Sequence, residues 1–250
     1  MERRSRCTLR RIRKNTTRSE GGLKLYPSDP RSTLSELKQE VRRAGEELRW
    51  LLDRGYPQES ALTFVCNHYK LSLKERNILA RTVFSEREAA ELKRRKADLR
   101  EALGKRVGID GYNVLITVET IVSGRPVFLC DDGWVRDVSA VFGKHRITPQ
   151  TSRALDELLS LLDSVRPAWV EFLYEKQVSW SGRLAELTRG KIEEKELDGT
   201  AKTVAGVDLE LRRRFDLIAT SDRAIILKHR KVLDLPSLVA GKLGTPLLRL

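Results

Sequence analysis

The chain has 250 residues, with 48 Lys or Arg against 35 Asp or Glu, so its formal net charge at pH 7 is +13. Apolar residues make up 40% of the chain, enough for a packed core, which excludes a chain that is disordered throughout. No apolar run reaches the roughly 18 residues of a membrane span, and the basic N-terminus lacks the apolar centre of a signal peptide, so we expect a cytoplasmic protein.

The positive charge is concentrated at the N-terminus. Residues 1–18 contain eight basic side chains and one acid, a net charge of +7, whereas the remaining 232 residues carry 40 basic and 34 acidic groups. This composition predicts a disordered basic arm over residues 1–30. We expect Arg10, Arg11 and Arg13 to bind nucleic-acid phosphates, because each neutralised phosphate releases a counterion without requiring a fixed geometry. A solubilising tail is the alternative.

Residues 31–104 are predicted to form a small α-helical domain. Apolar residues recur there at helical spacing, and Pro57 stands where the first turn of a helix tolerates proline. Three Ser or Thr residues are followed three positions later by Glu, the capping-box pattern that begins a helix: Thr33 with Glu36, Ser72 with Glu75 and Ser85 with Glu88. Four helices are therefore expected. Nucleic-acid contact is one interpretation of this domain, and packing as a homodimer or against a protein partner is the alternative.

Residues 105–250 are predicted to form an α/β domain. Short apolar strands alternate with helical patterns, which indicates a parallel sheet with helices on both faces. Strands are expected at residues 105–110, 169–174, 217–220 and 224–227, and helices at residues 149–162, 181–197 and 203–214. The pair Asp132-Gly133, common in tight turns, predicts a β-hairpin inserted at residues 127–138.

Polar side chains follow the expected strands where functional sites form in such sheets. Asp110 and Asn113 follow the first strand, Glu175 the second, and Ser221 and Asp222 the third, while Asp208 opens the helix before the third strand. Carboxylates that converge at one sheet edge repel each other unless a proton or a cation neutralises them. Mg²⁺ suits such a site and can promote phosphodiester hydrolysis. Each aspartate alone has a structural alternative as a helix or turn cap.

Three of these segments resemble motifs of the PIN-like superfamily, especially its NYN branch of metal-dependent ribonucleases. They are DGxN at residues 110–113, GVD at residues 206–208 and TSD at residues 220–222. The resemblance implies that Asp110, Asp208 and Asp222 hold Mg²⁺ or Mn²⁺, that Asn113 orients Asp110 or a phosphate, and that Glu175 completes the catalytic acids. The whole chain also resembles an uncharacterised prokaryotic family in which a helical domain carrying RGYP at residues 54–57 precedes the PIN-like half.

Three features depart from the PIN-like pattern. Ala224 stands where the family usually has another acid, the hairpin is an insertion, and Glu175 replaces an acid usually found on a helix. With these departures, we expect a Mg²⁺- or Mn²⁺-dependent endoribonuclease, with DNA as a second candidate substrate. Lys202, Ser221, Arg223 and the arm arginines are expected to bind the nucleic acid. A non-catalytic RNA-binding protein with a degenerate PIN-like site is the alternative.

Overall fold

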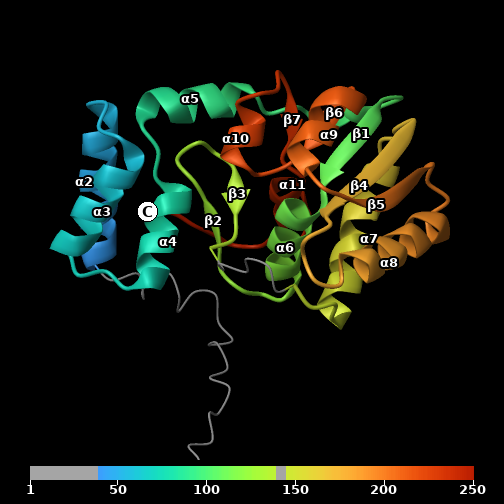
Figure 1. Cartoon of the computed structure of the whole chain (residues 1–250), viewed down its shortest axis with the longest axis horizontal. Coiled ribbons are helices and arrows are strands. Elements are labelled where there is room, and N and C mark those ends of the chain that lie inside the picture. Colours follow the sequence, from blue (N-terminus) through green and yellow to red (C-terminus); the bar gives the residue numbers. More distant parts are fainter. Residues whose placement is uncertain (1–38, 139–144) are drawn as a thin grey trace, which may run out of the picture.

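The computed structural model describes residues 39–138 and 145–250 (Figure 1). The expected arm, with Arg10, Arg11 and Arg13, lies outside the described residues, as does the capping box at Thr33 and Glu36. No helix in the described ranges has the length and apolar character needed to cross a membrane.

The first described region is helical, as its sequence predicts. Its helices are α2 (Gln39–Asp53), α3 (Gln58–His68), α4 (Leu73–Thr82) and α5 (Glu86–Arg94), followed by a 3₁₀ turn at Leu99–Ala102. The capping box at the start of α4 is confirmed, because the Ser72 hydroxyl accepts from the Glu75 backbone N–H and the Glu75 carboxylate accepts from the Ser72 backbone N–H at 2.7 Å. The Ser85 hydroxyl likewise accepts from the Glu88 backbone N–H at 3.3 Å and caps α5.

A five-stranded parallel sheet forms the centre of the second region, in the order β5-β4-β1-β6-β7. Its strands are β1 (Arg106–Asp110), β4 (Trp169–Glu175), β5 (Gly199–Val204), β6 (Leu217–Ala219) and β7 (Val232–Leu233). Ile109 of β1 lies opposite Phe172 of β4 on one side and Ala219 of β6 on the other. The expected mixed α/β fold with a parallel sheet is therefore confirmed.

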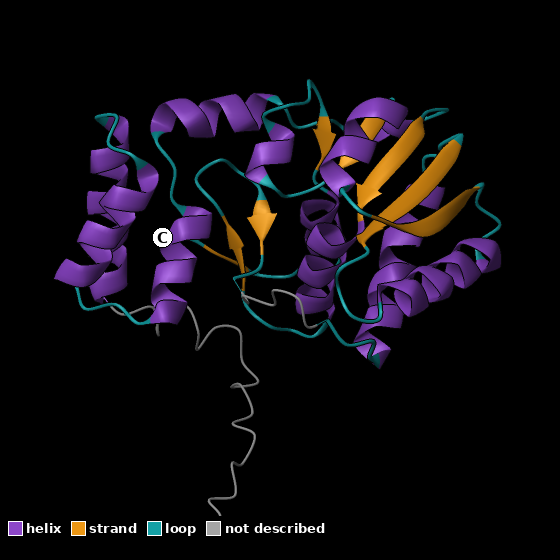
Figure 2. Cartoon of the chain, viewed as in Figure 1, coloured by secondary structure: helices purple, strands orange, loops and turns teal. Residues whose placement is uncertain are grey.

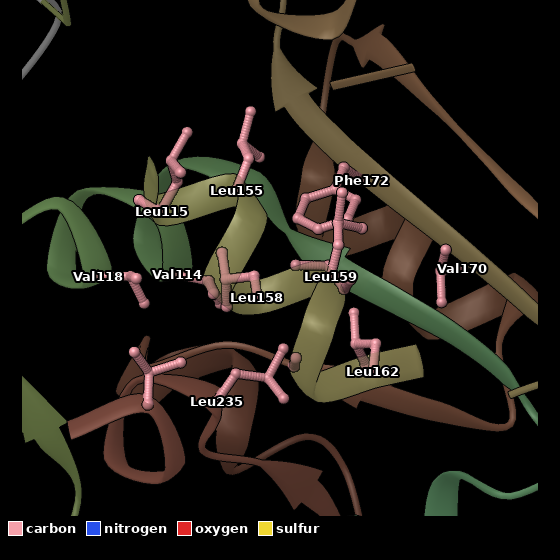
Figure 3. Close-up of a cluster of buried hydrophobic side chains, with 14 of the residues drawn as sticks. Val114, Leu115, Val118, Leu155, Leu158, Leu159, Leu162, Val170, Phe172 and Leu235 are labelled. Carbon is pink, nitrogen blue, oxygen red and sulfur yellow. The ribbon is translucent and has the colours of Figure 1, made fainter. Parts of the chain in front are cut away.

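Helices cover both faces of this sheet. Successive strand residues point to opposite sides, so the apolar strands present side chains on both faces for helices to bury. On one face, Ile109 and Phe172 share a buried cluster with α6 (Gly111–Val122), α7 (Pro149–Asp163), α8 (Ser181–Glu194) and α11 (Leu235–Lys242). Figure 3 shows leucines of α7 packed in this cluster against valines of α6. On the other face, Leu173 and Ile218 pack with α9 (Val207–Arg214) and α10 (Arg223–Ile226).

The expected hairpin is also present, and it joins the two regions. Strands β2 (Val127–Leu129) and β3 (Val135–Arg136) pair antiparallel around the Asp132-Gly133 turn, and β8 (Leu247–Leu248) adds to β2 in parallel. Phe84 before α5 and Leu92 within it share one buried cluster with Trp134 of the hairpin. The hairpin consequently lies between the helical region and the five-stranded sheet (Figure 2).

One predicted strand is wrong, and two strands of the five-stranded sheet were missed. The segment 224–227 is not a strand but lies in and just after α10, because the Asp222 carboxylate accepts from the backbone N–H groups of Ala224 and Ile225 and starts a helical turn. Strands β5 and β7 were not predicted. Only Ala201 is buried in β5, an edge strand, and β7 has two residues, so neither carries a long apolar pattern.

Candidate functional site

The site is positioned by the strand order of the sheet. Strands β4 and β5 lie on one side of β1, and β6 and β7 lie on the other, so the order reverses between β1 and β6. In open α/β sheets, a crevice forms at such a switch point beyond the carboxyl ends of the strands, because the two following connections diverge. Asp110 ends β1, and Thr220 to Asp222 directly follow β6. The DGxN and TSD segments therefore flank this point.

Asp110 is held at the switch point by three hydrogen bonds. Its side chain caps α6, with Oδ1 accepting from the Asn113 backbone N–H at 3.4 Å. Oδ2 accepts from the Asn113 side-chain amide at 2.7 Å and from the Thr220 hydroxyl at 2.8 Å. Asn113 thus orients Asp110, which is one of the two roles that the PIN-like resemblance implies. Thr220 ties Asp110 to the end of β6, although the sequence had suggested no role for this threonine.

The glycine of the DGxN segment is required by close packing. A Cβ atom at Gly111 would overlap the Tyr174 ring and lie 2.8 Å from the Leu173 carbonyl oxygen. Helix α6 can therefore begin against β4 only if this position lacks a side chain. The start of α6 directly after Asp110 depends on this close approach.

The environment of Asp110 shifts its titration toward neutral pH. The side chain is 4% exposed, and burial raises its pKa to about 6. Hydrogen bonds from Thr220 and Asn113 oppose this increase, whereas the negative charge of Asp222 adds to it. Carboxylates perturbed by both burial and a neighbouring charge are frequent at functional sites.

Asp222 lies in the loop that directly follows β6. Its Oδ1 accepts from the backbone N–H groups of Ala224 at 2.7 Å and Ile225 at 3.1 Å, and its own N–H donates to the Thr220 hydroxyl at 3.1 Å. Thr220 therefore contacts both aspartates, accepting from the backbone of one and donating to the carboxylate of the other. Asp222 does cap a helix, but both capping bonds use Oδ1.

Ser221 lies between these residues and is buried. Among the described residues, its hydroxyl oxygen has no hydrogen-bond partner. Its carbonyl oxygen accepts from Arg136 Nε at 2.9 Å, and Arg136 makes two further hydrogen bonds to Asp132, at 2.9 and 2.7 Å. The hairpin therefore holds the TSD loop through Arg136, which is fixed by its buried ion pair with Asp132. The sequence did not indicate this pair.

The other two acids lie near the start of α9, Asp208 in its first turn and Glu175 at the end of β4. Glu175 accepts from the Val207 backbone N–H at 3.0 Å, and Asp208 forms an ion pair with Lys228. Within residues 39–138 and 145–250, no group of three His, Cys, Asp or Glu side chains is arranged to hold a metal ion. The structure thus joins Asp110 with Asp222 and gives Asp208 and Glu175 other partners.

Of the basic residues expected to bind nucleic acid, the two that the structure describes, Lys202 and Arg223, also have protein partners. Lys202 on β5 pairs with the buried carboxylate of Glu171 at 2.7 Å. Arg223 forms an ion pair with Glu88 of α5 and a hydrogen bond with Gln58 of α3. Arg223 therefore fastens the helical region to α10, next to Asp222.

The described residues fit a two-carboxylate cation site better than a three-carboxylate one. Mg²⁺ is often held by one or two carboxylates, with waters and substrate phosphates completing its octahedron. Asp110 and Asp222 would supply the carboxylates of such a site, and the neighbouring Ser221 has a buried hydroxyl without a hydrogen-bond partner in the described chain.

The comparisons with known proteins agree with the two regions of the fold. A model described as "Protein of unknown function (DUF434)" matches residues 40–95, and one described as "Domain of unknown function (DUF5616)" matches residues 99–238. The Uncharacterized protein MJ0935 of Methanocaldococcus jannaschii is 37% identical over 200 residues, which cover 80% of this chain and 95% of that protein. No solved structure matches the chain.

These matches confirm the expected two-part uncharacterised family, and the PIN-like assignment stays a resemblance. The second model alone spans more than half of the chain, and the archaeal relative is matched over almost its whole length. The chain therefore belongs to the DUF5616 family, with a DUF434 region preceding that domain.

Proposed function

We propose that this protein is a metal-dependent nuclease that hydrolyses RNA phosphodiester bonds at a site centred on Asp110 and Asp222. One observation carries the proposal: the Thr220 hydroxyl contacts both the carboxylate of the buried Asp110 at the end of β1, at 2.8 Å, and the backbone N–H of Asp222 after β6, at 3.1 Å. Two such carboxylates are costly side by side unless a proton or a cation neutralises them. The PIN-like resemblance of the DGxN and TSD segments supports the same reaction.

Asp110 and Asp222 would hold Mg²⁺ or Mn²⁺, with a substrate phosphate completing the coordination. When bound, such an ion stabilises charge on phosphate oxygens and lowers the pKa of a coordinated water. Asn113 and Thr220 keep the Asp110 carboxylate in one orientation through their bonds to Oδ2. Thr220 also sets the spacing of the two aspartates, because it contacts both.

The proposal is tested by incubating the full-length protein with single-stranded and hairpin RNAs in Mg²⁺, Mn²⁺ or EDTA. Asp110→Asn and Asp222→Asn should each abolish metal-dependent cleavage, and Asn at position 222 still caps a helix. Asp216→Asn is the matched control, because Asp216 bridges the same two strands at their opposite ends by accepting from the Arg106 backbone N–H at 2.9 Å. Absence of metal-dependent cleavage by the unmodified protein, or full activity of both site variants, would refute the proposal.

A second candidate function is RNA binding without catalysis. It is favoured by the lack of a three-acid group in the described chain and by the ion pair of Asp208 with Lys228. This function predicts salt-sensitive RNA binding that persists in Asp110→Asn and weakens when residues 1–18 are removed. Binding that is lost in Asp110→Asn but unchanged without the arm would exclude it.

A further inference from the structure

An open pocket of about 800 Å³ lies beside the start of α8. It is lined by Arg146, Ile147, Trp180, Arg183, Glu186 and Leu187. Among its described lining residues, two arginines stand against a single acid, so this part of the lining is positively charged. Such a pocket suits a ligand that has both an apolar face and a negative charge.

Trp180 is the most unusual residue of this pocket. Its side chain is 61% exposed, and its backbone adopts the left-handed conformation with φ +68°. A bulky residue in this conformation is uncommon and is held there at an energetic cost. The Arg183 guanidinium lies 5.2 Å from the centre of the Trp180 ring. An aromatic surface and a cation are therefore presented together to solvent.

The pocket adjoins the edge of the sheet where Asp110 lies. Helix α8 follows β4, so Trp180 lies beyond the carboxyl end of that strand. At the wall of the pocket formed by Arg146, the preceding residue His145 has its ring 5.7 Å from the ring of Tyr112. His145 is fixed in turn by Glu119, at 2.8 Å. A continuous series of contacts thus connects the residue two positions after Asp110 with the pocket wall.

We infer that this pocket binds an unpaired base and a neighbouring phosphate of single-stranded RNA, with the base stacked on Trp180 and the phosphate held by Arg146 and Arg183. Aromatic side chains stack on any base, and arginine forks bind phosphate oxygens, so the two together recognise single strands rather than duplexes. The inference rests on the proposed function for its choice of RNA. It assigns the strand a path from the Asp110 crevice toward α8.

The test measures binding of a labelled single-stranded RNA to the full-length protein in EDTA, where no metal-dependent cleavage occurs. Trp180→Ala should weaken binding roughly tenfold, and Trp180→Phe should retain most of the affinity, because stacking on one aromatic ring contributes about this much. Trp50→Ala is the matched control. Trp50 on α2 is also exposed, at 54%, and the Arg54 guanidinium lies 3.5 Å from its ring centre. This variant should bind like the unmodified protein.

An abasic strand of the same length separates the contribution of base stacking to binding from the contribution of phosphate contacts. Trp180→Ala should bind this abasic strand as well as the unmodified protein does, whereas Arg183→Ala should weaken binding of both strands. The inference would be overturned if Trp180→Ala bound RNA as tightly as Trp50→Ala does. It would also be overturned if Trp180→Ala lost as much affinity for the abasic strand as for RNA. Equal affinity for a mononucleotide and for the longer strand would overturn it as well. Because the assay contains no metal, a lack of cleavage under other conditions leaves its outcome unchanged.

Discussion

The acids beside the β1/β6 switch point, Asp110 and Asp222, and the acids near the start of α9, Asp208 and Glu175, differ in their partners. Asp208 has Lys228 as a cation, and Glu175 accepts from a backbone N–H at the start of a helix. Asp110 and Asp222 share the uncharged Thr220, and within the described ranges neither forms an ion pair with Lys or Arg. A neutralised carboxylate has a structural role, whereas two unneutralised ones attract a proton or a cation. The comparison therefore supports the proposal that Asp110 and Asp222, rather than Asp208, form the reactive pair.

The strongest test of this comparison is to remove one charge from each region. Asp110→Asn should lower metal-dependent RNA cleavage by at least about 100-fold, because it removes a cation ligand. Asp208→Asn should lower cleavage only a few-fold, because that carboxylate already has a cation of its own. Initial cleavage rates at saturating Mn²⁺ give both values. Equal losses in the two variants would show that Asp208 belongs to the reactive site, as the PIN-like resemblance implies.

The two motif glycines provide a second test, on stability. Gly111→Ala should lower the free energy of unfolding by about 2 kcal/mol, because the new methyl group overlaps Tyr174. Gly206→Ala is the matched change at the start of α9, where an added Cβ meets nothing within 4 Å, and its cost should be below about 1 kcal/mol. Denaturant unfolding of both variants measures the difference. Equal costs would mean that the close approach of α6 to β4 does not constrain the site.

The third test concerns Thr220. Thr220→Val keeps the shape of the side chain but removes the bond to Asp110 and the acceptor for the Asp222 N–H. Cleavage should fall about tenfold, as it does when a residue that orients a metal ligand is lost, and the pH midpoint of activity should rise. Ser221→Ala is the neighbouring control for stability, because its buried hydroxyl has no partner among the described residues. A larger loss of stability in Ser221→Ala than in Thr220→Val would contradict these roles.

The smallest expected effect is on the pH dependence of stability. Because burial raises the pKa of Asp110 to about 6, the folded state binds its proton more tightly than the unfolded state does. Ionising Asp110 therefore costs stability, and this cost grows as the pH rises through the range between the unfolded and the folded pKa. From pH 5 to pH 7, the metal-free protein should lose about 1 kcal/mol more unfolding free energy than Asp110→Asn. Parallel stability curves for the two proteins would show that Asp110 titrates normally.

Local sequence patterns predicted much of the fold. The Ser72-Glu75 pattern, the Asp132-Gly133 turn and the start of α7 after Thr148 each depend on contacts within a few residues. Such signals survive in any tertiary context. They failed for the apolar run 224–227, where helix and strand patterns are indistinguishable and the Asp222 cap decides, and for β5, an edge strand with little apolar pattern.

The candidate site was predicted in part for the same reason. The sequence alone indicated that Asp110 and Asp222 end or follow core strands, because strand-turn-helix patterns are local. Tertiary structure decided which acids meet, since the strand order places Thr220 against Asp110, 110 residues away along the chain. It also decided that Asp208 pairs with Lys228 and that Arg223 reaches Gln58, 165 residues distant. Partners so far apart are brought together by the packing of whole elements, which no local spacing encodes.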